Sequence, residues 1–177
     1  MPRLTPIDPE TSTGRAREIF DGPLKGKHFN IFKGLANSPA ALDMYLAMSA
    51  ALSKASLSAK EQEVIQLAIG RANNCDYCQA AHTAIGTGAG LTEAQAIGAR
   101  RGVIEDDAKL NALAKFALTL HEKKGFVSDD DLNAFRNAGF DDAAITEVVA
   151  VYALATFTNM FNHVNESEVD FPPAPAL

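Results

Sequence analysis

Two helices and the turn between them can be read from residues 58–82, whose sequence is SAKEQEVIQLAIGRANNCDYCQAAH. Ser58, followed by Glu61 three positions later, forms a capping-box pattern that predicts the start of the first helix. The pair Asn73-Asn74 predicts the end of that helix and the cap of the second one. The chain is therefore expected to fold back at the asparagines into an antiparallel helical hairpin.

The rest of the sequence has the same helical character. Apolar residues recur at helical spacing from about residue 39 to 52, from 106 to 121 and from 141 onward. Thr92 with Gln95 repeats the capping pattern. No stretch alternates over enough residues to predict a strand. The predicted fold class is all-α, a compact helical bundle with a Cys-x-x-Cys pair at a helix N-terminus.

The length of 177 residues indicates a single domain, 1–177, with enough chain to bury a core. Its expected parts are a core at roughly 39–120, an N-terminal extension at 1–38, and a C-terminal helix with a proline-rich tail at 141–177. The last residues, 171–177, hold three prolines and cannot form a helix. They are expected to lie over the surface or over a neighbouring subunit.

Composition excludes several classes of function. The net charge of −6 argues against a nucleic-acid-binding protein, because neutralising phosphates requires an excess of Lys and Arg. No uninterrupted apolar run approaches the roughly 18 residues of a membrane span. Residues 1–10 lack the basic start and apolar segment of a secretory signal. We therefore expect a soluble cytoplasmic protein that binds neither nucleic acid nor membrane.

Large side chains outside the hairpin are expected to serve packing. Phe29, Phe32, Tyr45 and Met48 are assigned to the core or to a subunit contact rather than to a substrate pocket. His163, near the end of the final helix, either lines a pocket or makes a structural hydrogen bond.

Cys75 and Cys78 are the only cysteines, and the second helix of the hairpin starts at them. The first turn of a helix exposes unpaired N–H groups and the positive end of the dipole, which together favour a reactive thiolate. A spacing of three residues lets the two sulfur atoms meet across one turn as a disulfide. His82 follows Cys78 by four residues, so it lies on the same helix face and can exchange a proton near that sulfur.

Glu63 joins this group only if the chain folds back. On one continuous helix it would lie about 18 Å from Cys75 along the axis. In a hairpin that turns at residues 73–74, Glu63 and His82 stand at similar height on adjacent helices. A carboxylate there orients the imidazole and raises its basicity.

Redox chemistry is the leading interpretation of Cys75, Cys78, His82 and Glu63, and that chemistry requires no metal and no organic cofactor. A zinc site built from the same four residues has the right number of ligands and is one alternative. The second alternative is that each of these residues has only a structural role.

The spacing of these residues is similar to that of a known family. Glu63, eleven further residues, the Cys-Asp-Tyr-Cys run at 75–78, three residues and then His82 resemble the alkylhydroperoxidase D (AhpD-like) branch of the carboxymuconolactone decarboxylase family. The match covers roughly residues 39–120. The ending FTNMFNH at 157–163 is similar to a frequent C-terminal signature of its single-domain members.

The resemblance implies a helical homo-oligomer, a trimer or hexamer, that reduces hydrogen peroxide or small organic hydroperoxides. It assigns Cys78 as the peroxidatic thiol, which becomes a sulfenic acid, and Cys75 as the thiol that resolves it as a disulfide. Glu63 and His82 form the proton relay. A dithiol partner, a lipoyl or thioredoxin-like protein, reduces the disulfide. Tyr77 departs from the pattern, because some relatives carry histidine between the cysteines.

Two other functions are compatible with the same resemblance. One is a carboxymuconolactone-type decarboxylase of the same fold, although those members generally lack the redox pair. The other is a redox-sensitive binding module without turnover, in which peroxide oxidises the cysteines once.

Overall fold

The computed structural model describes residues 1–177, which form nine α-helices joined by short connections. Their bounds are α1 (Gly14–Asp21), α2 (Asn30–Leu35), α3 (Pro39–Leu52), α4 (Ala59–Ala72), α5 (Asp76–Gly88), α6 (Glu93–Arg101), α7 (Ala108–Glu122), α8 (Asp129–Asn137) and α9 (Asp142–Asn165). The structure contains no strand, so the all-α prediction is confirmed.

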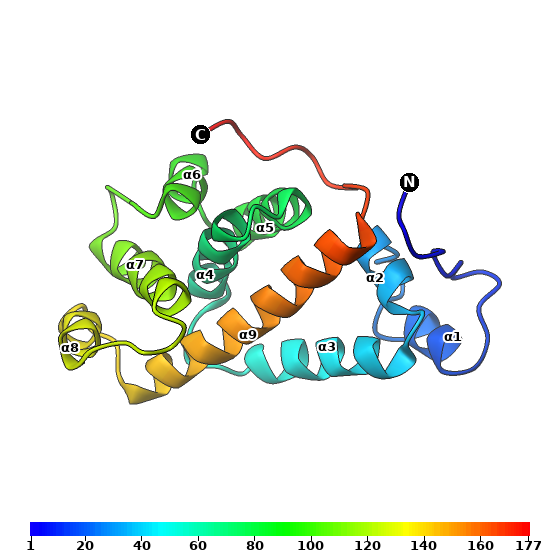
Figure 1. Cartoon of the computed structure of the whole chain (residues 1–177), viewed down its shortest axis with the longest axis horizontal. Coiled ribbons are helices and arrows are strands. Elements are labelled where there is room, and N and C mark those ends of the chain that lie inside the picture. The colour runs from blue at the N-terminus through cyan, green and yellow to red at the C-terminus, as the bar shows by residue number, and fades with distance from the viewer.

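The hairpin of α4 and α5 lies at the centre of the molecule, and α9 crosses it diagonally (Figure 1). α3 contacts α9 and diverges from it toward the end of the structure where α1 and α2 lie. α6, α7 and α8 lie at the opposite end, where α6 and α7 pack against α4. The hairpin therefore has other helices on several sides, and many of its residues, Cys75 and Cys78 among them, are buried.

The turn of the hairpin differs from the expected one in its cap. Asn74 takes a left-handed backbone conformation, with φ of 54°, which asparagine tolerates better than most residues. The N–H of Cys75 then donates to the carbonyl oxygen of Gly70 at 2.8 Å. The N-cap of α5 is Cys75 itself, whose Sγ accepts the N–H of Cys78 at 3.3 Å. The prediction that an asparagine caps this helix is therefore wrong, because Asn74 reverses the chain instead.

Two glycines allow α4 and α5 to approach closely. A Cβ atom added at Gly70 would lie 3.4 Å from the Cβ of Cys78. One added at Gly86 would lie 3.4 Å from the Cβ of Glu63 and 2.7 Å from Leu91 Cδ1. The distance to Glu63 is an ordinary van der Waals contact, whereas the clash is with the end of the Leu91 side chain, so a larger residue at Gly86 would first displace Leu91.

Two hydrophobic clusters form the interior. The larger one joins α4, α6, α7, α8 and α9 and includes Val64, Leu67, Leu113 and Val148. The smaller one joins the N-terminal residues to the start of α5, and its members include Ile19, Phe20, Ile31, Phe32, Cys75, Tyr77 and Cys78. The two cysteines thus lie in the cluster that the N-terminal extension helps to build.

α9 has the length and the mean hydropathy, 1.4 over its most apolar window, of a membrane-spanning helix. Scattered polar residues interrupt its sequence, so it contains no long uninterrupted apolar run. In the structure this helix packs against α3, α4, α5 and α7. It buries three asparagines, Asn159, Asn162 and Asn165, so polar side chains share the face that packs against the rest of the protein.

Adjacent valines on α9 provide a matched test of the core. Val148 is fully buried, whereas Val149 is 47% exposed. We expect Val148→Ala to lower the free energy of unfolding by about 2 kcal/mol, because it removes two buried methyl groups and leaves a void. Val149→Ala should stay within about 0.5 kcal/mol of wild type. Urea denaturation of both variants measures the difference, and equal losses would contradict this packing of α9.

Candidate active site

The fold-back places the four predicted side chains in one region. Cys75 and Cys78 are joined as a disulfide, with their Cα atoms 5.3 Å apart. Nδ1 of His82 lies 2.7 Å from Oε2 of Glu63. A carboxylate only accepts hydrogen bonds, so Nδ1 carries the proton and Nε2 is the ring nitrogen left for proton exchange.

These groups are shielded from bulk water to different degrees. Cys75 and Cys78 are 1% and 2% exposed. The side chains of His82 and Glu63 are 17% and 13% exposed. A reagent therefore has to reach the sulfur atoms from within the protein, through a cavity rather than across an open surface.

A cavity of about 880 Å³ provides that access. Its wall includes Cys78, His82 and Glu63, whereas Cys75 is not part of it. The two cysteines are therefore not equivalent, because only Cys78 faces the space that a small molecule can enter. This asymmetry agrees with the nucleophile role predicted for Cys78, which remains a prediction.

The N-terminal third of the chain supplies much of the apolar wall of the cavity. The lining residues there include Phe29, Ile31, Phe32, Tyr45 and Leu46, and Phe171 joins them from the C-terminal tail. Phe32 belongs to the smaller core cluster and Phe29 and Tyr45 pack against it, as expected of core residues. All three also line this cavity, because the N-terminal segment folds over the start of α5. Met48, by contrast, packs against the larger core cluster as expected.

Two further polar residues in the cavity wall escaped the sequence reasoning. Asn162, on α9, is 4% exposed and donates from Nδ2 to Sγ of Cys78 at 3.4 Å. Gln66, one turn after Glu63 on α4, is 7% exposed, and its Oε1 has no hydrogen-bond partner. The three buried asparagines recur at a spacing of three on an otherwise apolar helix, and this pattern is the signal that would have found Asn162.

Tyr45 adds a phenol to the wall near Glu63. Burial raises the pKa of Tyr45, and the negative charge of Glu63 raises it further. The hydroxyl of Tyr45 therefore stays protonated at neutral pH and can act as a hydrogen-bond donor in the cavity wall.

Tyr77, the residue between the cysteines, ties α5 to two other segments. Its hydroxyl donates to Oδ1 of Asp170 at 2.7 Å and accepts the N–H of Ile31 at 3.3 Å. The second carboxylate oxygen of Asp170 accepts the N–H of Asn30 at 2.7 Å. The side chain of Tyr77 thus points toward the start of α2 and the tail, where it has a structural role.

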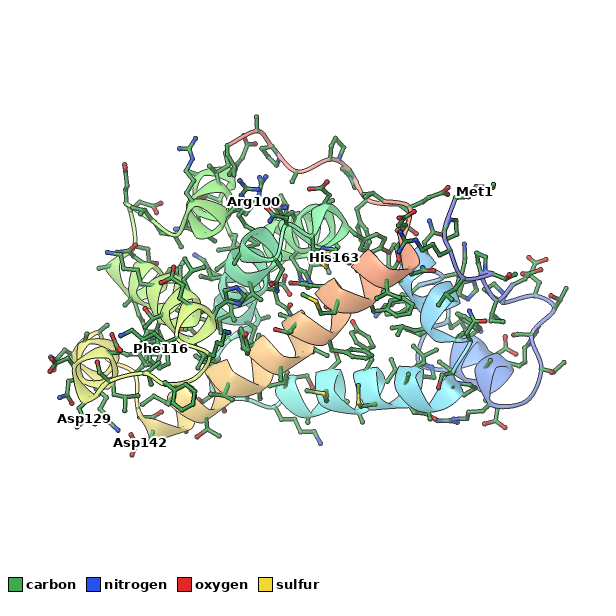
Figure 2. The ribbon with its side chains drawn as sticks, in the orientation of Figure 1. Met1, Arg100, Phe116, Asp129, Asp142 and His163 are labelled. Carbon is green, nitrogen blue, oxygen red and sulfur yellow. A yellow bond between two sulfur atoms is a disulfide. The ribbon has the colours of Figure 1, made fainter.

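The C-terminal tail lies over its own chain. Phe171 stacks on Phe29 with ring centroids 4.5 Å apart. Arg100 reaches from α6 toward the tail (Figure 2) and donates from Nη1 to the carbonyl oxygen of Pro175 at 2.6 Å. Of the two positions expected for this segment, the structure shows the first, over the surface of the same subunit.

Replacing Tyr77 tests this tie through its dependence on pH. Burial and then the bond to Asp170 raise the pKa of Tyr77. The unfolded tyrosine ionises near pH 10, about its ordinary pKa, while the folded one keeps its proton. The contribution of Tyr77 to stability is therefore full below about pH 10 and is lost as pH rises through the higher folded value.

We expect Tyr77→Phe to be less stable than wild type by about 1 kcal/mol at pH 7, the value of one net hydrogen bond. The difference between the two proteins should shrink from about pH 10 upward. Urea denaturation at a series of pH values measures it. A difference that grows with pH would contradict the raised pKa.

His163 lies near the C-terminal end of α9 (Figure 2), is exposed and does not line the cavity. No group of three or more His, Cys, Asp or Glu side chains is arranged to hold a metal ion. Of the four residues proposed as zinc ligands, Cys75 and Cys78 are bonded to each other, while His82 is paired with Glu63.

Comparison with known proteins gives one family match. Residues 39–121 match the model of the carboxymuconolactone decarboxylase family. No curated protein matches the sequence. The matched segment contains α3 to α6 and almost all of α7, and therefore the whole hairpin with its cysteines, His82 and Glu63.

Solved structures share the fold over almost the whole chain. An uncharacterized peroxidase-related protein from Ralstonia eutropha, described as an alkylhydroperoxidase AhpD core, has a TM-score of 0.85 at 23% identity, over 96% of this chain and 92% of its own. A peroxidase-related protein from Silicibacter sp. has a TM-score of 0.79 at 21% identity, over 94% and 92%. A debrominase in complex with 2,3,4-tribromopyrrole has a TM-score of 0.78 at 15% identity, over 95% and 91%. The AhpD-like fold is confirmed, and more than one activity occurs on it.

Proposed function

Because residues 39–121 belong to the carboxymuconolactone decarboxylase family, we propose that the protein is a thiol peroxidase of the alkylhydroperoxidase D type. Its substrate is hydrogen peroxide or a small organic hydroperoxide. One observation carries the proposal: Cys78 lines the cavity beside the Glu63–His82 pair, while its disulfide partner Cys75 lies outside the wall. An oxidisable pair of which only one sulfur is accessible suits a cycle of attack and resolution.

In the first half of the cycle His82 takes the proton of the Cys78 thiol. The thiolate sulfur attacks the terminal oxygen of the hydroperoxide, so an S–O bond forms as the O–O bond breaks. The departing alkoxide, or hydroxide from hydrogen peroxide, takes the proton back from His82. Cys78 is left as a sulfenic acid, oxidised by two electrons, and the substrate leaves as an alcohol or water.

In the second half Cys75, having lost its proton, attacks the sulfur of Cys78. The S–O bond breaks, hydroxide leaves and takes a proton to become water, and the disulfide seen in the structure forms. A dithiol partner then returns two electrons and two protons through a mixed disulfide. Such a partner, a lipoyl or thioredoxin-like protein, is kept reduced in the cytoplasm, where we place this activity.

The cavity favours an organic substrate over hydrogen peroxide alone. Its volume of about 880 Å³ far exceeds the needs of a four-atom molecule, and Phe29, Phe32 and Leu46 offer an apolar surface. An organic hydroperoxide can bury its hydrocarbon part there while its O–O bond faces Cys78. The apolar wall thus supports the second of the two substrate classes.

The same proposal includes a homo-oligomer, a trimer or a hexamer. Large apolar side chains stand exposed on α3 and α9, among them Met44 at 43%, Val149 at 47% and Met160 at 43%. Contact with other copies of the chain would bury such residues. Analytical ultracentrifugation measures the number of subunits.

A steady-state assay of hydroperoxide consumption with a regenerating dithiol tests the function. The proposal expects many turnovers per subunit, and oxidation of no more than one equivalent would indicate a redox-sensitive binding module. A decarboxylase would keep its activity when Cys75 and Cys78 are both serine, whereas the peroxidase would lose it. Cumene hydroperoxide and hydrogen peroxide, assayed side by side, compare the two substrate classes.

A further inference from the structure

The side chain of Asn162 has a single hydrogen-bond partner, the Sγ atom of Cys78. A disulfide sulfur carries no hydrogen, so the amide group must present its NH₂ to the sulfur. The carbonyl oxygen of the same amide is buried and has no partner. Leaving a buried polar atom unpaired is costly, so a position that tolerates it calls for an explanation.

The neighbouring asparagines of α9 show what a structural amide does in this protein. Oδ1 of Asn165 accepts the N–H of Leu4 at 3.1 Å, and its Nδ2 donates to Oγ of Ser167 at 2.9 Å. Oδ1 of Asn159 accepts from Nδ2 of Asn73 at 2.9 Å, although its own Nδ2, like Oδ1 of Asn162, is buried without a partner. Both side chains connect separate segments of the chain, whereas that of Asn162 connects α9 to the sulfur alone.

The sulfur of the other cysteine, Cys75, accepts a hydrogen bond from a different donor. Sγ of Cys75 accepts the N–H of Cys78 at 3.3 Å, a bond that comes from the helix backbone. Sγ of Cys78 has no backbone donor, and Asn162 Nδ2 is its only hydrogen-bond donor in the oxidised state. The two sulfur atoms thus have separate hydrogen-bond donors. Only the donor to Cys78 belongs to a side chain, so only that donor can be removed by substitution.

We propose that Asn162 is a catalytic residue whose amide stabilises the thiolate and then the sulfenate of Cys78. The inference rests on the proposed reactivity of Cys78 and adds a residue from outside the Cys-x-x-Cys hairpin to it. Hydrogen bonds to a charged acceptor are about twice as strong as those between neutral groups. The donation from Nδ2 therefore gains strength when the disulfide is reduced and the sulfur becomes negative.

The reduced protein provides the test, with alkylation of Cys78 by iodoacetamide followed across a range of pH in a Cys75→Ser background. The pH midpoint of alkylation reports the thiolate fraction without any peroxide. Asn162→Ala should move the midpoint upward by about one pH unit, and the alkylation rate at neutral pH should fall about tenfold. Asn162→Asp has nearly the same shape and should move it further, because a carboxylate repels a thiolate.

Asn165→Ala, in the same Cys75→Ser background, is the matched control. Asn165 is 2% exposed and lies one turn from Asn162, so the variant loses a buried amide without touching the sulfur. Its alkylation midpoint should equal that of its parent. Circular dichroism confirms folding, and if Asn162→Ala does not fold, the isosteric aspartate variant gives the answer.

The outcomes separate this inference from the proposed function. A parental midpoint well below that of an ordinary thiol, unchanged in both Asn162 variants, overturns the role of Asn162 and leaves the peroxidase intact. A parental midpoint near that of an ordinary thiol, about 8.5, counts against a reactive Cys78 and overturns both. An equal shift in Asn165→Ala would show a general effect of α9 packing and would also overturn the inference.

Discussion

Cys78→Ser is expected to abolish steady-state reduction of hydroperoxide, whereas Cys75→Ser should complete one oxidation and then stop. Only Cys78 belongs to the wall of the cavity, so only its sulfur can meet the O–O bond of a bound substrate. Without Cys75 the sulfenic acid has no partner inside the protein, and it persists until a reagent traps it.

The measurement combines peroxide consumption with chemical trapping. With no dithiol present, Cys75→Ser should consume one equivalent of hydroperoxide per subunit, and dimedone should label Cys78, as seen by mass spectrometry. Cys78→Ser should consume none above background and carry no label. When a dithiol is added, the wild-type protein should turn over continuously.

A physical argument also supports the opposite assignment, in which Cys75 attacks the hydroperoxide and Cys78 resolves the sulfenic acid. The experiment therefore discriminates between the two assignments. Cys75 is the N-cap of α5, and the N–H of Cys78 bonds to its sulfur at 3.3 Å. A thiolate at that position gains from the helix dipole. If Cys78→Ser formed the trapped sulfenic acid and Cys75→Ser did not, helix capping would outweigh access to the cavity, and the two roles would have to be exchanged.

Removing the acid–base pair should slow the oxidation step by about 10²–10⁴-fold. The hydrogen bond of 2.7 Å between Glu63 and His82 fixes the ring and sets its proton on Nδ1. Glu63→Gln keeps the shape and removes the charge, while His82→Ala removes the base itself. Stopped-flow measurement of the second-order rate of sulfenic acid formation records both effects.

Because the two side chains act as a unit, the double variant should be about as slow as the slower single variant. Two control variants replace the same residue types, a glutamate and a histidine, at positions outside the Glu63–His82 pair. Glu61→Gln alters an acid on α4 that caps the helix through Ser58, and His121→Ala alters a histidine on α7 near Tyr152. Both should react at the wild-type rate, and an unchanged rate in Glu63→Gln and His82→Ala would remove the relay from the mechanism.

The sequence predicted the hairpin because its signals are local. Capping residues, a turn at Asn73-Asn74 and helical spacing act over a few positions. The fold-back then placed Glu63 beside His82 by simple counting from the turn. The identity of the cap was missed, because sequence preference favours asparagine at this place while the reversed chain at Asn74 gives the position to Cys75.

The cavity wall was harder to predict because it is assembled from distant segments. Phe29 and Phe32 reach the cavity only because the N-terminal segment packs against the first turn of α5. No local pattern encodes that packing, and an aromatic residue in a core and one in a pocket look alike in sequence. Asn162 could have been predicted from the sequence, since three buried asparagines on one face are unusual for an apolar helix.

A cavity that exposes one sulfur of the pair has a kinetic consequence. In the proposed cycle, oxidant and electron donor would reach the cysteine pair through the same cavity in alternate halves, since Cys75 is 1% exposed and does not line that cavity. The proposed peroxidase would then follow a ping-pong mechanism, in which each reagent can also bind the redox form of the protein with which it does not react. We therefore expect a high concentration of the donor to block the reduced form, so that the velocity passes through a maximum rather than reaching a plateau.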